Sequence, residues 1–154
     1  MPAVVLENIR SCYNVGNIIR TADALWYDVL ISWYTPWPDK IWVSKTALGS
    51  EKSVNIKTFY NTKKANDFIK SKYWNLLAAE IVKWTSKNLL NYNLDYNDFW
   101  IVFWNELTWV LEETLEFVDD IIHIDMLWKK ESLNVWQTSA IFMWELNKKL
   151  YYKS

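Results

Sequence analysis

Both arginines of the chain fall in one segment near its start, and their position suggests binding of an anionic or hydroxylated ligand. The segment runs from Asn8 to Ala22 (NIRSCYNVGNIIRTA) and holds Arg10 and Arg20 among 17 basic residues in all. A guanidinium stays charged and binds oxyanions with two parallel hydrogen bonds, so phosphate and ribose oxygens are natural targets. Gly16 would leave the first turn of a helix open to a ligand. The alternative is that both arginines form ordinary surface ion pairs.

Two later segments place polar side chains where a strand gives way to a helix. The segment 103–110 (FWNELTWV) carries one carboxylate, Glu106. With glycine at positions 104 and 109 it would be a flexible loop that can wrap a nucleoside, whereas literal tryptophans there would plug that space. The segment 124–135 (IDMLWKKESLNV) places Ser132 and Asn134 at the start of the last helix. The alternatives are a plain turn, in which Glu106 is favourable near a helix N-terminus, and an ordinary helix cap.

Strands and helices alternate along the chain, and this alternation must position the three segments. Strands are predicted at 3–7, 28–32, 99–103 and 120–124, and helices at 15–25 (with Asn14 as N-cap), 62–72, near 110–117, and 132–150. Residues 33–55 are expected to be mostly loop, and 75–82 fit either a strand or a helix. Strands that are apolar on both faces indicate an α/β fold with a parallel sheet flanked by helices. Ligands bind such sheets beyond the carboxyl ends of the strands, here after Glu7, Ser32, Phe103 and Ile124.

Length and composition indicate one soluble domain spanning residues 1–154, with no second domain. No apolar run reaches the ~18 residues of a membrane helix, and no signal peptide is visible, so a cytoplasmic location is expected. The net charge of −1 gives no global attraction to nucleic acid. No Cys/His cluster exists, which predicts that no metal is bound. His123, in an apolar strand, is expected to be a satisfied core residue, and Cys12 is expected to pack.

The tryptophan content is abnormal. The chain has 2 glycines and 12 tryptophans, together 14 of 154 residues, a share close to and slightly above the ordinary glycine content of about 7%. Several tryptophans occupy positions typical of glycine, such as Trp26 directly after a predicted helix. We interpret most of them as glycines in the organism, encoded by UGA, which some bacteria read as glycine; Trp144, within a helical pattern, fits least well. The alternative is a truly tryptophan-rich protein with aromatic platforms for bases or sugars.

Taken together, the three segments resemble the motifs of the SpoU branch of the SPOUT class of RNA methyltransferases. Residues 8–21 resemble N-x-R-S-x-x-N-x-G-x-I-x-R-T. Residues 104–109 resemble a G-N-E-x-T-G loop, and residues 126–135 resemble M-x-G-x-x-x-S-L-N-V, if Trp104, Trp109 and Trp128 stand for glycine. The stretch 45–51 (KTALGSE) also resembles a family segment. The resemblance covers nearly the whole chain in order and spacing.

The resemblance implies a parallel sheet with a deep C-terminal trefoil knot, a homodimer, and transfer of a methyl group from S-adenosylmethionine to a ribose 2′-hydroxyl of tRNA or rRNA. It implies that Arg20 orients that hydroxyl and that Arg20 lies near the cofactor of the partner subunit, so that the subunits of the dimer share the site. The other implied catalytic residues are Asn14, Glu106, Ser132 and Asn134. The implied cofactor contacts are Phe103, Trp104, Asn105, Trp109, Ile124, Met126, Leu133 and Asn134. The implied RNA contacts are Arg10, Arg20, Lys45, Lys129 and Lys130, within a patch that also includes Lys40 and Lys52; ordinary solvated lysines are the alternative.

Two other functions remain open at this point. One is a non-catalytic RNA-binding dimer with the knot fold, favoured if the tryptophans are literal and fill the cofactor pocket. The other is methylation of a base instead of a ribose.

Overall fold

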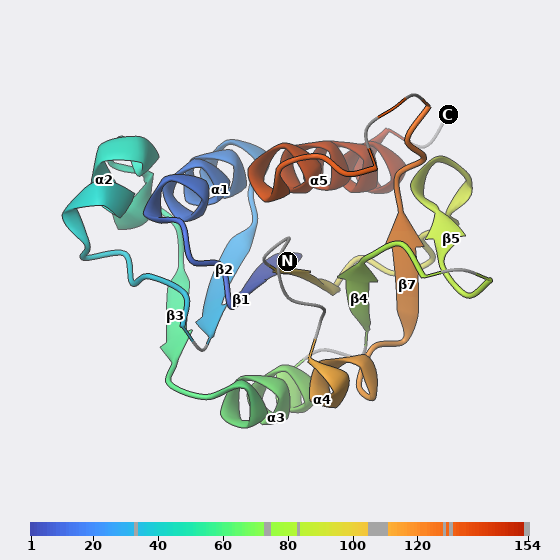
Figure 1. Ribbon diagram of the computed structural model, residues 1–154, viewed down its shortest axis with the longest axis horizontal. Helices are drawn as coiled ribbons and strands as arrows, with labels where there is room; N and C mark the ends of the chain where they lie inside the picture. Colours follow the sequence, from blue (N-terminus) through green and yellow to red (C-terminus); the bar gives the residue numbers. More distant parts are fainter. Residues whose placement is uncertain are drawn as a thin grey trace.

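The computed structural model describes residues 1–32, 34–72, 75–82, 84–104, 111–127, 129 and 131–152. Within these ranges the strands form a parallel seven-stranded sheet in the order β3-β2-β1-β6-β4-β7-β5 (Figure 1). The strands are β1 (Ala3–Glu7), β2 (Asp28–Ser32), β3 (Ile56–Phe59), β4 (Leu76–Ala79), β5 (Lys87–Asn88), β6 (Trp100–Trp104) and β7 (Asp120–His123). The prediction of a parallel α/β sheet is therefore confirmed.

Helices cover both faces of this sheet. On one face lie α1 (Cys12–Leu25), α2 (Ile41–Ala47) and α5 (Val135–Tyr151), and on the other lie α3 (Thr62–Lys72) and α4 (Glu112–Leu115) (Figure 1). Each face has its own apolar cluster. Alternate residues of β6 belong to the two clusters. Ile101 and Phe103 lie on the face covered by α1 and α5, whereas Trp100 and Val102 lie on the face covered by α3. None of the helices in the described ranges has the length and apolar character required to span a bilayer.

The first helix begins earlier than the sequence predicted. It starts at Cys12, and its N-cap is Ser11, whose hydroxyl accepts a hydrogen bond from the Asn14 backbone N–H at 3.3 Å. The prediction of Asn14 as N-cap is therefore wrong, because a serine three residues earlier fulfils that role. Asn14 lies in the first turn of α1 instead, half-buried.

Residues 33–55 are less irregular than predicted, since they contain α2 and a 3-10 turn at Ser50–Lys52. Helix α2 packs closely on α1, and Gly16 makes this contact possible. A Cβ atom on Gly16 would lie 1.8 Å from Thr46 Oγ1 and 2.5 Å from the Val43 carbonyl oxygen. The close approach expected at Gly16 is thus made by a neighbouring helix, not by a ligand.

Trp26 has the backbone conformation that its sequence position suggested. It caps α1 in the left-handed region, with φ 62° and ψ 53°, where its N–H reaches back to the last carbonyls of the helix. This conformation favours glycine. Trp84 is also left-handed, with φ 73°. By contrast, Trp100 is buried in β6 against the edge of Phe68, so not every tryptophan occupies a position typical of glycine.

Candidate functional site

The carboxyl edge of the sheet brings the ends of two of the three motif segments side by side. Glu7, the last residue of β1, pairs in register with Ser32 of β2 on one side and with Trp104 of β6 on the other. The first and second segments therefore leave the sheet from adjacent strands. The third leaves from β7, which is separated from β6 by β4. The site predicted beyond these strand ends is thus supported by the topology.

Both arginines of the first segment project from the protein without an internal partner. Arg10 and Arg20 are exposed, and among the described residues neither side chain makes a hydrogen bond or an ion pair. The alternative that they are surface ion-pair partners is therefore wrong within the described part of the chain. Arg10 lies three residues after the end of β1, and Arg20 lies on α1; both exposed guanidinium groups are available to bind phosphate or ribose oxygens.

The third segment leads into a capped helix. The Asn134 side chain accepts a hydrogen bond from the Trp136 backbone N–H at 3.1 Å and so caps α5, which begins at Val135. Ser132 and Lys129 are exposed, whereas Leu133 is half-buried. The cap occupies the Asn134 amide oxygen and leaves its Nδ2 group free to serve as a donor.

The residues predicted to contact the cofactor differ in how far their side chains are buried. Phe103 is buried against the edge of Phe142, with ring centroids 5.7 Å apart, so only its backbone can meet a ligand. The Trp104 ring packs on the cluster that faces α3 and α4. Ile124 and Met126, after β7, are half-buried.

Several predicted residues lie outside the described residues. They are Asn105, Glu106 and Trp109 of the second segment, and Trp128 and Lys130 of the third. Lys45 is described: it is exposed on α2, with its ammonium group 4.2 Å from the centre of the Trp42 ring.

Two carboxyl groups at the same sheet edge, those of Glu7 and Glu80, were not predicted from the sequence as part of the site. Glu7 is buried, and its side chain accepts a hydrogen bond of 2.8 Å from the Thr114 hydroxyl. Glu80, just after β4, accepts one of 2.7 Å from the Ile81 backbone N–H. Burial raises the pKa of both carboxyls above the ordinary value. The signal for Glu7 was available, since it is the charged end of an otherwise apolar strand.

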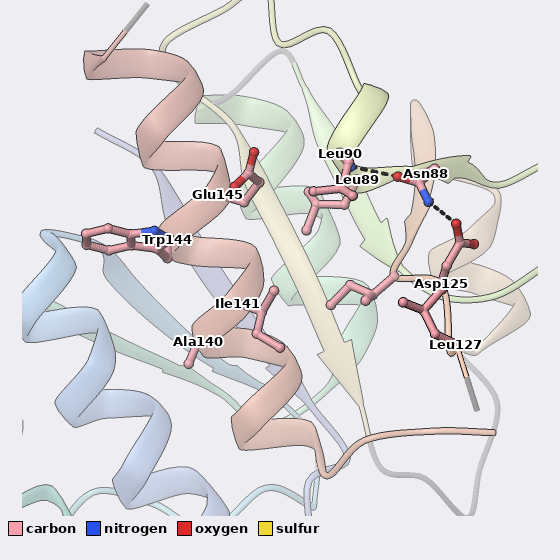
Figure 2. A pocket seen from close by; sticks show the side chains of 10 residues that line it. Asn88, Leu89, Leu90, Asp125, Leu127, Ala140, Ile141, Trp144 and Glu145 are labelled. Atoms are coloured by element: carbon pink, nitrogen blue, oxygen red, sulfur yellow. Dashed lines mark hydrogen bonds between the residues drawn. The ribbon is translucent and has the colours of Figure 1, made fainter. Parts of the chain in front are cut away.

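A pocket of about 550 Å³ lies between α5 and the segment that follows β5 (Figure 2). Its walls are mostly apolar and include Leu89, Ile141 and Trp144, with Asp125 and Glu145 at its rim. Ile124, Asp125 and Leu127 of the third segment also line it. Among the described cofactor contacts that the sequence predicts, Ile124 is the one that the pocket includes, so the pocket adjoins the start of the third segment.

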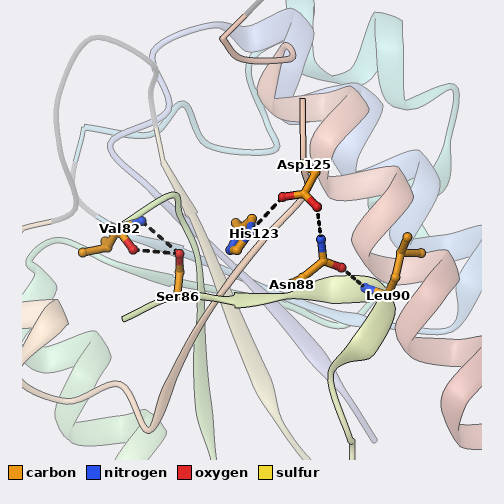
Figure 3. A network of polar contacts seen from close by, with 6 residues as sticks. All are labelled: Val82, Ser86, Asn88, Leu90, His123 and Asp125. Carbon is orange, nitrogen blue, oxygen red and sulfur yellow. Dashed lines mark hydrogen bonds and ion pairs between the residues drawn. The ribbon is translucent and has the colours of Figure 1, made fainter. Parts of the chain in front are cut away.

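A polar network fixes the segment after β7 beside this pocket (Figure 3). Asp125 contacts His123 Nε2 at 3.1 Å and accepts a hydrogen bond of 2.5 Å from Asn88. His123 is thus paired through one ring nitrogen, while its buried Nδ1 has no hydrogen-bond partner among the described residues. The expectation of a satisfied core histidine is met at one nitrogen and not at the other. In the described ranges no three Cys, His, Asp or Glu side chains gather as a metal site would require.

Comparison with known proteins links this arrangement to a family. The model of the SpoU rRNA Methylase family matches residues 1–144. The tRNA (guanosine(18)-2′-O)-methyltransferase of Escherichia coli (strain K12) is 30% identical over 146 residues, which cover 92% of this chain and 61% of the relative. The chain thus spans about three fifths of the length of that relative.

Solved structures show the same fold. The AdoMet-bound rRNA methyltransferase of Sinorhizobium meliloti superposes with a TM-score of 0.88 at 20% identity, covering 97% of this chain and 56% of the other. A protein described in work on "the 2-OH methylation of C/U34 on tRNA" superposes with a TM-score of 0.84 at 18% identity, covering 99% of this chain and 98% of the other. Because the family model matches residues 1–144, nearly the whole length of this chain, the chain belongs to the SpoU rRNA Methylase family.

Proposed function

We propose that this protein transfers a methyl group from S-adenosylmethionine to a ribose 2′-hydroxyl of tRNA or rRNA. The observation that carries the proposal is the family match over residues 1–144, and it is supported by the exposed Arg10, just after β1, and the exposed Arg20 on α1. The 30% identical relative is named for 2′-O-methylation of a tRNA guanosine, which supports ribose over base as the target.

The residues after β7 have the chemistry that S-adenosylmethionine requires. Half-buried Ile124, Met126 and Leu133 offer apolar surface for an adenine ring, and exposed Ser132 and Asn134 offer hydrogen bonds for hydroxyl and amino-acid groups. Backbone groups of Phe103 and Trp104 would complete the contacts, with Asn105 and Trp109 following in the same segment. When bound, the cofactor supplies an already activated methyl group on a sulfonium.

Because the methyl group is activated, the protein's task is to orient the ribose hydroxyl and to help it lose its proton. Arg20 is suited to hold the hydroxyl and its neighbouring phosphate and to stabilise the developing alkoxide, because a guanidinium stays charged and is a poor base. Asn14 and Glu106 are proposed to act near the same hydroxyl, while Ser132 and Asn134 shape the cofactor side. Arg10, Lys45, Lys129 and Lys130 would contact RNA phosphates.

We further propose the knotted C-terminal segment and the homodimer that the family resemblance implies. Support for a dimer comes from α5, where Ile141 and Trp144 are exposed apolar residues beside the pocket of Figure 2. Exposed apolar surface of this kind is typical of a subunit interface.

A labelled-methyl transfer assay tests the function. The purified chain is incubated with radiolabelled S-adenosylmethionine and either total tRNA or ribosomal RNA, and the product is cleaved with alkali. A methylated ribose blocks cleavage at one linkage, so one resistant position is expected. Label in RNA that is cleaved at every position would mean base methylation, and no label with either RNA would contradict the proposal.

A further inference from the structure

Beyond the predicted basic contacts, exposed aromatic side chains gather at the part of the sheet edge that the motif segments do not use. Tyr34 follows β2 and is 70% exposed, and Tyr60 follows β3 and is 73% exposed. The segment between β2 and α2 carries Tyr34 and Trp37, and the Trp37 ring lies against Tyr60 with centroids 4.8 Å apart. Residues from two separate segments therefore present aromatic rings on one surface.

The surface is fixed to the start of the first motif segment by a buried threonine. The Thr35 hydroxyl accepts a hydrogen bond from the Ile9 backbone N–H at 3.1 Å and donates one to the Leu6 carbonyl at 3.0 Å. Thr35 and Ile9 are both buried, and the next residues along the chain, Tyr34 and Arg10, are both exposed. The backbone of the exposed Arg10 is thereby held near that of Tyr34.

The charge of this region favours an anionic partner. Residues 8–20 and 34–47 contain four basic residues (Arg10, Arg20, Lys40 and Lys45) and one acidic residue (Asp39), in a chain whose net charge is −1. Positive groups that follow a phosphate backbone, interleaved with aromatic rings on which bases stack, are the usual means of binding single-stranded nucleic acid.

We propose that Tyr34 and Tyr60 form a stacking platform for unpaired RNA bases that flank the methylated nucleotide. The inference rests on the proposed function. The strand order places β2 and β3 directly beyond β1, and β6 on its other side. At about 4.8 Å per strand, the end of β3 lies about 14 Å from the end of β6, so the platform serves neighbouring nucleotides and not the target itself.

The platform depends on the two tyrosines whatever residue occupies position 37. With tryptophan there, as in the sequence, the ring of Trp37 extends the aromatic surface beside Tyr60. The substrate class that fits is an RNA loop, because bases in a duplex are already stacked on one another and cannot reach a side chain.

Binding of a fluorescein-labelled RNA stem-loop, compared with a blunt RNA duplex of the same length, tests the platform in the full chain. We expect Tyr34→Ala and Tyr60→Ala each to weaken stem-loop binding by about fivefold to a hundredfold, the range for one stacked base. Tyr34→Phe and Tyr60→Phe should keep near wild-type affinity, because phenylalanine also stacks. Tyr152→Ala is the matched control, since Tyr152 is 74% exposed at the far end of α5.

The outcomes separate this inference from the proposed function. Unchanged stem-loop binding by both alanine variants, equal losses with phenylalanine, or no stem-loop binding by the wild type would each overturn the platform. Cofactor affinity and thermal midpoint are measured on the same proteins, and both should stay unchanged in the alanine variants. A wild type that binds the stem-loop through the tyrosines but transfers no methyl group would refute the proposed function and leave the platform intact.

Discussion

The hydroxyl of Thr114 donates a hydrogen bond of 2.8 Å to the side chain of Glu7, which lies 107 residues earlier in the chain. This contact joins the end of the interior strand β1 to α4, the helix that follows the second motif segment. The carboxyl is buried, and its second oxygen has no hydrogen-bond partner among the described residues. Burial disfavours the charged form, so the fold favours a protonated Glu7.

Glu7→Gln is therefore expected to make stability less dependent on pH. In the unfolded chain Glu7 loses its proton near its ordinary pKa of 4.5, whereas burial raises the pKa in the folded chain. Between these two values the unfolded state binds fewer protons, so the stability of the wild type falls as the pH rises. Glutamine does not titrate. At pH values above both pKa values, the thermal midpoint of the variant should be higher than that of the wild type. This difference in midpoint should shrink as the pH approaches about 4.

The control for this prediction is Glu112→Gln, which changes an exposed carboxylate on α4. Its midpoint should follow the wild type at every pH. A Glu7→Gln variant that is less stable than the wild type at neutral pH, or that is offset equally at all pH values, would contradict a carboxyl whose pKa is raised by burial.

Gly16→Ala should destabilise the protein by about 1–3 kcal/mol, the usual cost of overpacking. The new methyl group would collide with Thr46 Oγ1 and with the Val43 carbonyl, and a backbone oxygen does not move aside as a flexible side chain would. The free energy of unfolding in urea measures the loss. Because alanine is the better helix former, a gain in stability would show that α2 does not pack on α1 at this distance.

Trp26→Gly and Trp84→Gly should each stabilise the protein by about 0.5–1 kcal/mol. Both residues have left-handed backbone, which costs a residue with a Cβ atom about 1–2 kcal/mol, and the greater freedom of glycine in the unfolded chain offsets part of this gain. Little packing is lost, because Trp26 is 67% exposed and Trp84 is fully exposed.

Trp144→Gly is the matched control, because Trp144 is 62% exposed but lies within α5. It should lose about 1 kcal/mol, the cost of glycine inside a helix. The intact mass of the protein from its native host then tests the recoding hypothesis itself. A mass lower by about twelve tryptophan-to-glycine differences is expected, and a mass that matches the printed sequence would refute it.

Arg20→Ala should lower kcat for methyl transfer by about 10²- to 10³-fold, the usual effect of removing one donor to a developing oxyanion. Cofactor affinity should not change, since the proposed role of Arg20 concerns the ribose. Arg20→Lys should recover only part of the rate, because an ammonium group lacks the planar pair of donors. Radiolabel transfer at saturating RNA gives kcat, and unchanged activity in the alanine variant would refute the role.

Much of the fold was predictable, because the strands and helices with many buried residues show clear apolar runs or clear helical spacing in the sequence. The strands β1, β2 and β6 and the helices α3 and α5 were all expected from apolar runs or helical spacing. Helix α2 was missed because Val43 and Ala47 are its buried residues, too few to mark a helix beside two prolines. The edge strands β3 and β5 were missed since neither carries a buried apolar run.

The site was predictable as a set of segments but not as a set of contacts. Motif spacing located the strand ends correctly, because parallel strands end at one edge. It could not show that Asn134 is engaged as a helix cap, that Phe103 is buried, or that Glu7 joins β1 to α4, since each depends on which residue a distant segment brings alongside.

The place of β1 in the sheet also has a consequence for synthesis of the protein. Its partner on one side, β2, follows within 30 residues, but its other partner is β6, and Ala3 pairs with Trp100. On the ribosome, β1 must therefore keep one edge unpaired until most of the protein has been made. An exposed strand edge is a template for wrong pairing, so the nascent chain has its greatest need of chaperone protection in this interval.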